Sequence, residues 1–395
     1  MKGAESPDGV SFSLVRGDPW FRVQQAIGLI PPSGLGIVRR SVVFALVTWV
    51  PLVIWAMLWR RAFPGELAEP LLQHIGIHAR CLVAIPLLII SEAAADRYPR
   101  ELFPYFLTSG LVHDDAKPKF HGILRSAEKM RDSWMAWGSL LGVTLFMTLA
   151  GSYESAHLHD VAWAQVESGG KVSLGFGGWW YLVVVRFMFT FLLLVWAWRL
   201  LVCSALLWRI SRLDLQLVPT HPDGAGGLGF LQDIPIIFSL VVFAMSVVMA
   251  SRWEHDVLYH GAQSTSFNIL LTVFVAMMFV LFLSPLTFFS RGLRRLKQHS
   301  LLDYGALVGQ HGRLVQRRWI FGNDIKNTAL LQAPELGPVS DTVAMYKVVE
   351  DIRIILIGKR SLLAIGLPAL LPMLPLWAID IPLKELVMKL LEALI

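Results

Sequence analysis

The chain has 395 residues, of which 55% are hydrophobic and only 16% are charged, and its mean hydropathy is +0.57. A soluble domain carries about a quarter of its residues as charged side chains, so this composition excludes an ordinary soluble globular protein. The net charge of +6 does not indicate a nucleic-acid partner, because the basic residues lie between apolar runs, where they act as an orientation signal.

Residues 1–40 predict an N-terminal segment that lies at the cytoplasmic surface of the membrane. Asp18 and Pro19 are typical of a helix N-cap and its first-turn proline, and apolar residues follow at helical spacing. The stretch has no short apolar core followed by a small-residue cleavage site, so it does not have the pattern of a signal peptide. We expect an interfacial helix and then an uncleaved first span.

Seven apolar runs predict an all-α, polytopic transmembrane helical bundle, because about 20 apolar residues cross the hydrocarbon core. The bundle is expected at 41–290, with a glycine-rich loop at 219–233 between the fourth and fifth spans. The last run contains prolines, and it predicts either a kinked span or a re-entrant piece buried in protein. The predicted segments are 41–59, 71–91, 134–151, 179–208, 234–250, 267–289 and 361–378.

Basic residues predict a cytoplasmic N-terminus and an external C-terminus. Seven lysines and arginines lie within residues 92–133, whereas the loop at 152–178 holds one basic residue, Lys171. The basic stretch at 291–360 has two helical patterns and predicts cytoplasmic helices that extend the bundle. The final part, 361–395, is expected to form the seventh segment and an amphipathic helix.

The stretch 220–230 is a polar, glycine-rich break between two apolar segments. Its His-Pro-Asp-Gly sequence at 221–224 predicts a tight turn, and the glycines behind it allow backbone N–H groups to approach an anion such as phosphate. A tight hairpin whose glycines only permit close helix packing is an equal alternative. The candidate anion ligands are the amides of Gly224, Gly226, Gly227 and Gly229.

The loop that begins His221-Pro222-Asp223-Gly224 resembles one in uncharacterised bacterial multi-pass inner-membrane proteins. The resemblance covers the loop and its flanks. It implies a location in the bacterial inner membrane, and it supplies no catalytic assignment.

Histidines and carboxylates gather in the two loops predicted to lie outside the membrane. Asp256 and His260 are four positions apart, which places them on one face if the segment is helical. Imidazole and carboxylate suit zinc or another divalent ion, whereas solvated loop side chains are the plainer interpretation. No other cofactor is expected. The candidate metal ligands are His157, His159, Glu254, His255, Asp256 and His260.

Charged residues inside the predicted spans indicate a polar pathway or a helix contact. Arg186 lies seven residues into the fourth span, about 10 Å deep at 1.5 Å per residue. Pairing of Arg186 with Glu92 or Asp256 is the alternative to an aqueous route, and we expect Arg199 to reach toward the membrane surface. Two histidines of the second segment share a face with its glutamate by helical spacing. The candidate pathway residues are Arg186, His74, His78 and Glu92.

These features predict an oligomeric channel or transporter rather than an enzyme, because charge lies within the spans and no nucleotide-binding, zinc-protease, serine-hydrolase or EF-hand motif is found. Arginine and histidine outnumber acids in the spans, which favours anions. One alternative is a membrane enzyme that acts on a lipid or lipid-linked phosphate, with His221 and Asp223 as acid and base. Another is a scaffold that senses metal or protons and relays the change through 291–360. The expected partners are the lipid bilayer and further copies of the chain.

Overall fold

The computed structural model is an all-α helical bundle, as the sequence predicts. It describes residues 12–32, 34–63, 70–150, 162–168, 171–260, 267–322 and 337–375. Within this part of the chain, strand is confined to one antiparallel pair, β1 (Gln165–Ser168) and β2 (Lys171–Leu174).

The helices follow one another with few long interruptions. Those of the first half are α1 (Pro19–Ala26), α2 (Ile37–Leu58), α3 (Ile75–His78), α4 (Ile85–Ile90), α5 (Glu92–Thr108), α6 (Lys117–Arg131) and α7 (Trp134–Ala150). Those of the second half are α8 (Phe176–Trp180), α9 (Phe187–Ile210), α10 (Ser239–His260), α11 (Phe267–Leu283), α12 (Ser290–Val315), α13 (Gly337–Glu350) and α14 (Lys359–Leu370). Among the shorter turns that join them are η2 (Ala79–Ala84), η6 (Tyr181–Arg186), η7 (Gly229–Phe238), η9 (Ser284–Phe289) and η11 (Leu371–Met373).

Six helical runs within the described residues are long and apolar enough to cross a membrane, so the chain is a multi-pass membrane protein. The longest has 52 residues, about 78 Å at 1.5 Å per residue, whereas the hydrocarbon core is about 30 Å thick. Such a run continues well beyond the bilayer. The six runs are Ile37–Leu58, Ile75–Thr108, Asp114–Ala150, Phe176–Ile210, Gly229–Val257 and Phe267–Arg318.

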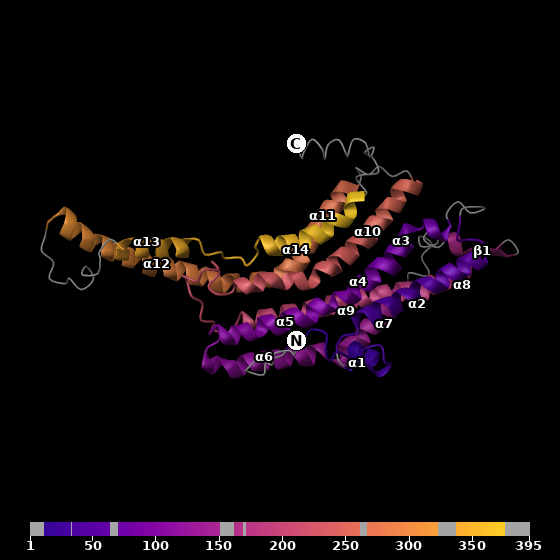
Figure 1. The fold of residues 1–395 in the computed structure, drawn as a ribbon, viewed down its shortest axis with the longest axis horizontal. Coiled ribbons are helices and arrows are strands. Elements are labelled where there is room, and N and C mark those ends of the chain that lie inside the picture. The colour runs from indigo at the N-terminus through magenta and orange to yellow at the C-terminus, as the bar shows by residue number, and fades with distance from the viewer. Residues whose placement is uncertain are drawn as a thin grey trace.

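The bundle is elongated, and its two ends differ (Figure 1). At one end, α12 and α13 lie side by side and project away from the remaining helices. The hairpin of α5 and α6 also extends toward this end. At the opposite end lie α3, α8 and the β1 and β2 pair. The basic helix α12 therefore extends the last of the six candidate spans out of the bundle.

The seventh predicted segment forms a short helix in the described part of the chain. Helix α14 has 12 residues, and the turn η11 continues it to Met373. It packs against α10 and α11, and Ser246 donates a hydrogen bond to the carbonyl of Ala369 at 2.6 Å. The last predicted residues, 376–378, lie outside the described chain, so both alternatives for this segment stay predictions. The expected terminal amphipathic helix lies outside the described residues.

The second candidate span is not a uniform α-helix, because the π-type turn η2 interrupts it just before Pro86. The ring of a proline clashes with the carbonyl four residues earlier, and a wider turn relieves this clash. The additional residue in the turn shifts the helical phase, and His74 precedes the first helical residue. The continuous face predicted for His74, His78 and Glu92 is therefore wrong.

The end of the bundle at α8 contains a tryptophan contact that leaves no room for a side chain at Gly177. A Cβ built on Gly177 would lie 2.9 Å from Cζ3 of Trp163 and closer still to the ring of Trp55. We expect Gly177→Ala to lower the melting temperature, because overpacking costs about 1–3 kcal/mol. Thermal unfolding in detergent, followed by circular dichroism, measures the effect.

The matched control is Gly142→Ala in α7, where a new Cβ would meet nothing within 4 Å. Alanine is the better helix former, so this variant should melt at the same or a higher temperature. Equal melting temperatures for both variants would contradict the close packing at Gly177.

Candidate functional site

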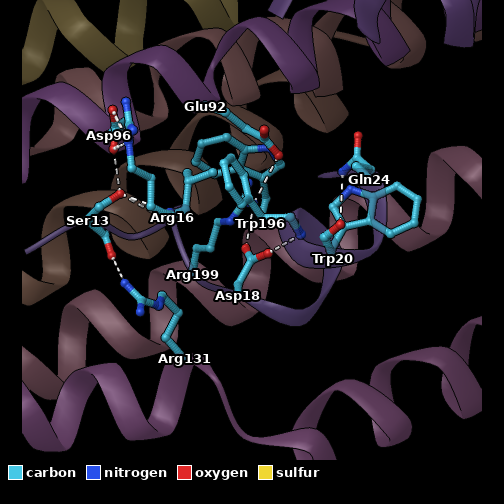
Figure 2. A network of polar contacts seen from close by, with 12 residues as sticks. Ser13, Arg16, Asp18, Trp20, Gln24, Glu92, Asp96, Arg131, Trp196 and Arg199 are labelled. Carbon is cyan, nitrogen blue, oxygen red and sulfur yellow. Dashed lines mark hydrogen bonds and ion pairs between the residues drawn. The ribbon is translucent and has the colours of Figure 1, made fainter. Parts of the chain in front are cut away.

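Four charged side chains from distant parts of the chain meet inside the bundle. Asp18 precedes α1, Arg40 lies in α2, Glu92 begins α5 and Arg199 lies in α9, and each is at most 1% exposed. Nη2 of Arg199 lies 2.9 Å from Oδ2 of Asp18 and 3.0 Å from Oε1 of Glu92, as Figure 2 shows. Arg40 pairs with the other carboxylate oxygen of Glu92. Two positive and two negative charges thus balance, and we call these residues the ion quartet.

Asp18 has two functions in the ion quartet. Its Oδ1 caps α1 by accepting a hydrogen bond from the backbone N–H of Phe21 at 2.6 Å, which confirms the predicted N-cap, and its Oδ2 accepts from Arg199. Burial raises the pKa of Asp18 above its ordinary value, and the charge of Arg199 opposes this rise. The pKa of Asp18 is therefore raised less than burial alone would raise it.

The segment before α1 is tied to α5 and α6 as well. The hydroxyl of Ser13 donates to Oδ1 of Asp96 at 2.8 Å, and Nε of Arg16 lies 3.0 Å from the same oxygen. Arg131 of α6 donates to the carbonyl of Ser13. These contacts, drawn in Figure 2, fix the residues around Asp18 against the bundle.

The ion quartet bears on two expectations for the spans. Arg199 is buried within the protein between the carboxylates of Asp18 and Glu92, and its position relative to the membrane surface stays a prediction. Arg186 does not pair with Glu92, because the two oxygens of Glu92 are bonded to Arg40 and Arg199. In this arrangement Glu92 holds helices together rather than facing an aqueous route.

The histidines predicted for the pathway lie at the other end of the second span. The ring of His74 stacks on that of His255 of α10, with 5.3 Å between centroids. Nδ1 of His78 accepts a hydrogen bond from the indole of Trp49 at 2.8 Å. Both imidazoles are thus engaged in contacts with neighbouring helices.

Arg80 is the charged residue that sequence reasoning did not select in this region. It is half-buried in η2, and its guanidinium lies 5.6 Å from the ring centroid of Tyr181 and 5.4 Å from that of Phe189. It also donates a hydrogen bond to the hydroxyl of Tyr181. Across the described ranges of the chain, no carboxylate forms an ion pair with Arg80, and its Nε is buried without a hydrogen-bond partner. A signal was present, since Arg80 lies in an apolar run five residues after Ile75.

Arg186 lies between Tyr181 and Phe189 in the sequence. It ends η6, a second π-type turn, and is half-buried. Arg80 and Arg186 thus each lie in a π-type turn of a candidate span.

The predicted metal ligands are only partly within the described chain. Glu254, His255 and Asp256 lie near the end of α10, whereas His157 and His159 fall outside the described residues and the side chain of His260 is not described. Among the residues described, no group of three or more histidine, cysteine, aspartate or glutamate side chains could hold a metal ion. The metal site remains a prediction.

The glycine-rich loop surrounds a carboxylate of its own. Oδ1 of Asp223 accepts from the amides of Ala225 at 2.8 Å and Gly227 at 3.2 Å, and Oδ2 accepts from the amide of Gly229 at 2.7 Å. The loop is therefore an amide nest whose anion is internal. Of the glycines predicted to bind phosphate, Gly227 and Gly229 already bond to Asp223.

The other two glycines of the loop, Gly224 and Gly226, permit its backbone conformation. Gly224 has φ +60° and Gly226 has φ +64°, conformations that favour glycine. The carbonyl of Gly224 accepts from the amide of Arg353 at 2.8 Å, and the Arg353 side chain donates to the carbonyl of Asp223 at 2.6 Å. The loop is thereby joined to the segment between α13 and α14.

The acid and base predicted in the loop are in contact, since Nδ1 of His221 lies 2.9 Å from Oδ1 of Asp223. Partial burial opposes ionisation of Asp223, yet the backbone amides that donate to it lower its pKa from the ordinary value of 3.8. A carboxylate with a lowered pKa is a weak proton acceptor. The geometry favours a structural role for this pair.

No family model, curated protein or solved structure matches this chain. The ion quartet, the arginines in the π-type turns and the glycine-rich loop are therefore the features that bear on function.

Removal of Arg199 tests the ion quartet. We expect Arg199→Gln to destabilise the protein by about 3–5 kcal/mol, because Asp18 and Glu92 would remain buried with one positive charge fewer. Thermal unfolding in detergent measures this. The double variant Arg199→Gln, Asp18→Asn should recover part of the loss, since it removes one of the stranded charges.

The control for the quartet is Arg97→Gln, which removes an exposed arginine paired with Glu101 on the surface of α5. Its melting temperature should change little. If Arg199→Gln melts like Arg97→Gln, the ion quartet does not stabilise the bundle.

The loop carboxylate gives a pH dependence with a definite sign. A carboxyl group whose pKa is lowered by folding contributes stability above its ordinary pKa and loses that contribution as the pH falls below about 4. We expect Asp223→Asn to lower the melting temperature at neutral pH and to reduce the loss of stability on acidification. Melting curves measured across this pH range would contradict the nest if both proteins changed in parallel.

Proposed function

We propose that this protein is a channel or transporter for anions in the bacterial inner membrane, with the glycine-rich loop and helices α12 and α13 in the cytoplasm. The observation that carries the proposal is Arg80, a guanidinium within a candidate membrane span whose contacts among the described residues are aromatic rings and a phenol rather than a carboxylate.

A charged residue in the hydrocarbon is costly unless a partner or water stabilises it. The aromatic faces of Tyr181 and Phe189 supply part of this stabilisation through cation–π contacts, which are worth about 0.5–2 kcal/mol each. They do not neutralise the charge, and Nε of Arg80 has no hydrogen-bond partner. An anion that passes the guanidinium would supply both the opposite charge and a hydrogen-bond acceptor.

The surroundings of Arg80 favour anions over cations. Arg186 lies three positions before Phe189, whose ring contacts Arg80, and His78 and His74 lie two and six positions before Arg80 in the chain. Both arginines lie in π-type turns, which often occur at functional sites in helices. Positive charge along a pore or cavity lowers the barrier for anions and raises it for cations.

The paired charges of the ion quartet contrast with the charge of Arg80, which has no carboxylate partner among the described residues. Its charges are balanced and its side chains are at most 1% exposed. It fixes α2, α5 and α9 relative to one another, and Arg80 is not among its charges. Oligomerisation is part of the proposal because α7 buries only 17% of its apolar window, so its outer face requires lipid or another copy.

The enzyme alternative has less support. A reaction on a lipid-linked phosphate with Asp223 as the base would need a carboxylate that accepts a proton near neutral pH. Asp223 instead accepts hydrogen bonds from three backbone amides, which stabilise its ionised form. No specific observation favours the sensory scaffold among the described residues.

The test is anion flux in proteoliposomes. We expect the reconstituted protein to increase chloride, sulfate or phosphate efflux, and we expect Arg80→Gln to reduce this efflux by roughly ten-fold, the cost of one charge-assisted hydrogen bond. Arg80→Lys keeps the charge but not the planar fork, so it should retain an intermediate flux.

Arg97→Gln is the matched control, because it removes an arginine of the same span that lies exposed on α5. It should conduct as the unmodified protein does. Proteoliposomes no more permeable than protein-free vesicles, or full flux in a folded Arg80→Gln variant, would overturn the proposal.

A further inference from the structure

A cavity of about 600 Å³ lies where the fourth span ends and the sixth leaves the membrane. One wall is the segment 211–217 that follows α9, and the other is formed by η9 and the first turns of α12. Its volume is within the range of about 300–1,000 Å³ that is typical of small-molecule sites. The cavity is distinct from Arg80 and Arg186 and from the amide nest of Asp223.

The charged side chains of the cavity are mainly basic. Arg212, Arg291 and Arg295 line it together with a single carboxylate, that of Asp214. Within the described ranges, none of the three arginines forms an ion pair, and the guanidinium of Arg212 lies 5.0 Å from the ring centroid of Trp208. Arg291 and Arg295 are four positions apart on α12, so they present adjacent guanidinium groups on one face.

The remaining lining is apolar. Leucines of the segment after α9 and two phenylalanines of η9 face the same space as the arginines. Aromatic and basic side chains together at the end of a span are typical of the head-group region of a membrane. The cavity therefore offers cations for an anion and apolar surface for the chain attached to it. The apolar lining residues are Leu213, Leu215, Leu217, Leu228, Phe288 and Phe289.

We propose that this cavity binds a phosphate group, and that the apolar wall favours an anionic phospholipid of the cytoplasmic leaflet as its source. Guanidinium groups bind phosphate oxygens through paired, charge-assisted hydrogen bonds. The three arginines exceed the one carboxylate by two positive charges, which suits a phosphate that carries one to two negative charges. The site does not depend on the proposed anion route, and its test measures binding rather than transport.

The size of the cavity at α12 depends on a glycine. Gly292 lies in its wall between the two α12 arginines, and a Cβ built there would meet only Cδ1 of Leu217, at the ordinary contact distance of 3.9 Å. Alanine is therefore accommodated at this position, whereas a larger side chain would extend into the space of the ligand. Gly292 thus provides a variant that fills the site without changing its charge.

The experiment measures thermal stabilisation of the purified full-length chain in nanodiscs. The first arm compares phosphatidylcholine discs with and without phosphatidic acid, and the second adds inorganic phosphate to phosphatidylcholine discs. We expect phosphatidic acid to raise the melting temperature, because a ligand that binds only the folded state stabilises it. In the double variant Arg291→Gln, Arg295→Gln, and separately in Gly292→Leu, the concentration of phosphatidic acid needed for the same shift should rise by at least roughly ten-fold.

The matched control is the double variant Arg294→Gln, Arg313→Gln. It removes the same number of charges from α12 at positions that do not line the cavity, so its response to phosphatidic acid should equal that of the unmodified chain. A shift produced by inorganic phosphate alone, and lost in the cavity variants, would support the phosphate site with free phosphate as the source. Equal responses in the cavity and control variants, or no shift in either arm, would overturn the proposal.

Discussion

The pairing of Arg199 with Glu92 and Asp18 is the interaction on which the arrangement of the bundle depends. Asp18 and Arg199 are separated by 181 positions in the chain, and Arg199 and Glu92 by 107. Each buried ion is costly alone, and the opposite charges of the complete set offset part of this cost. The N-terminal segment, α2, α5 and α9 must therefore be docked together, because a helix that moved away would leave an uncompensated charge. The charges specify position, whereas the surrounding apolar contacts supply most of the burial energy.

The same residue type serves two opposite purposes in this protein. Arg199 is 1% exposed and paired with two carboxylates, so its charge is cancelled and it is closed to solvent. Arg80 is half-buried and lies over aromatic rings, so its charge persists. In the sequence, both arginines lie in apolar runs, and their roles cannot be distinguished from these runs alone. The difference arises from which carboxylates the fold brings near, and that is a property of tertiary structure.

Local patterns predicted what depends on neighbours in the chain. The apolar runs predicted the candidate spans, and Asp18 and Pro19 predicted the start of α1, since each signal is contained within one element. Three features could not be predicted in this way. The π-type turns shift the helical phase within an apolar run, the ion quartet joins residues from four segments, and the loop glycines do not reveal whether their anion is a ligand or Asp223. Helical spacing relates residues of one helix only, so cross-helix pairs escape it.

The contacts of the glycine-rich loop determine its structural role. Because Asp223 occupies the nest, the loop has a fixed shape that does not wait for an external anion. A Cβ at Gly226 would lie 3.0 Å from Leu296 and 3.3 Å from Leu217, so the absence of a side chain lets the loop pack directly on α12. Leu217 and Leu296 are also walls of the basic cavity. The carboxylate of Asp223 thus fixes the shape of the loop. The loop packs against the first turns of α12, where Arg291 and Arg295 lie. The loop shapes an anion site in its neighbours instead of forming one itself.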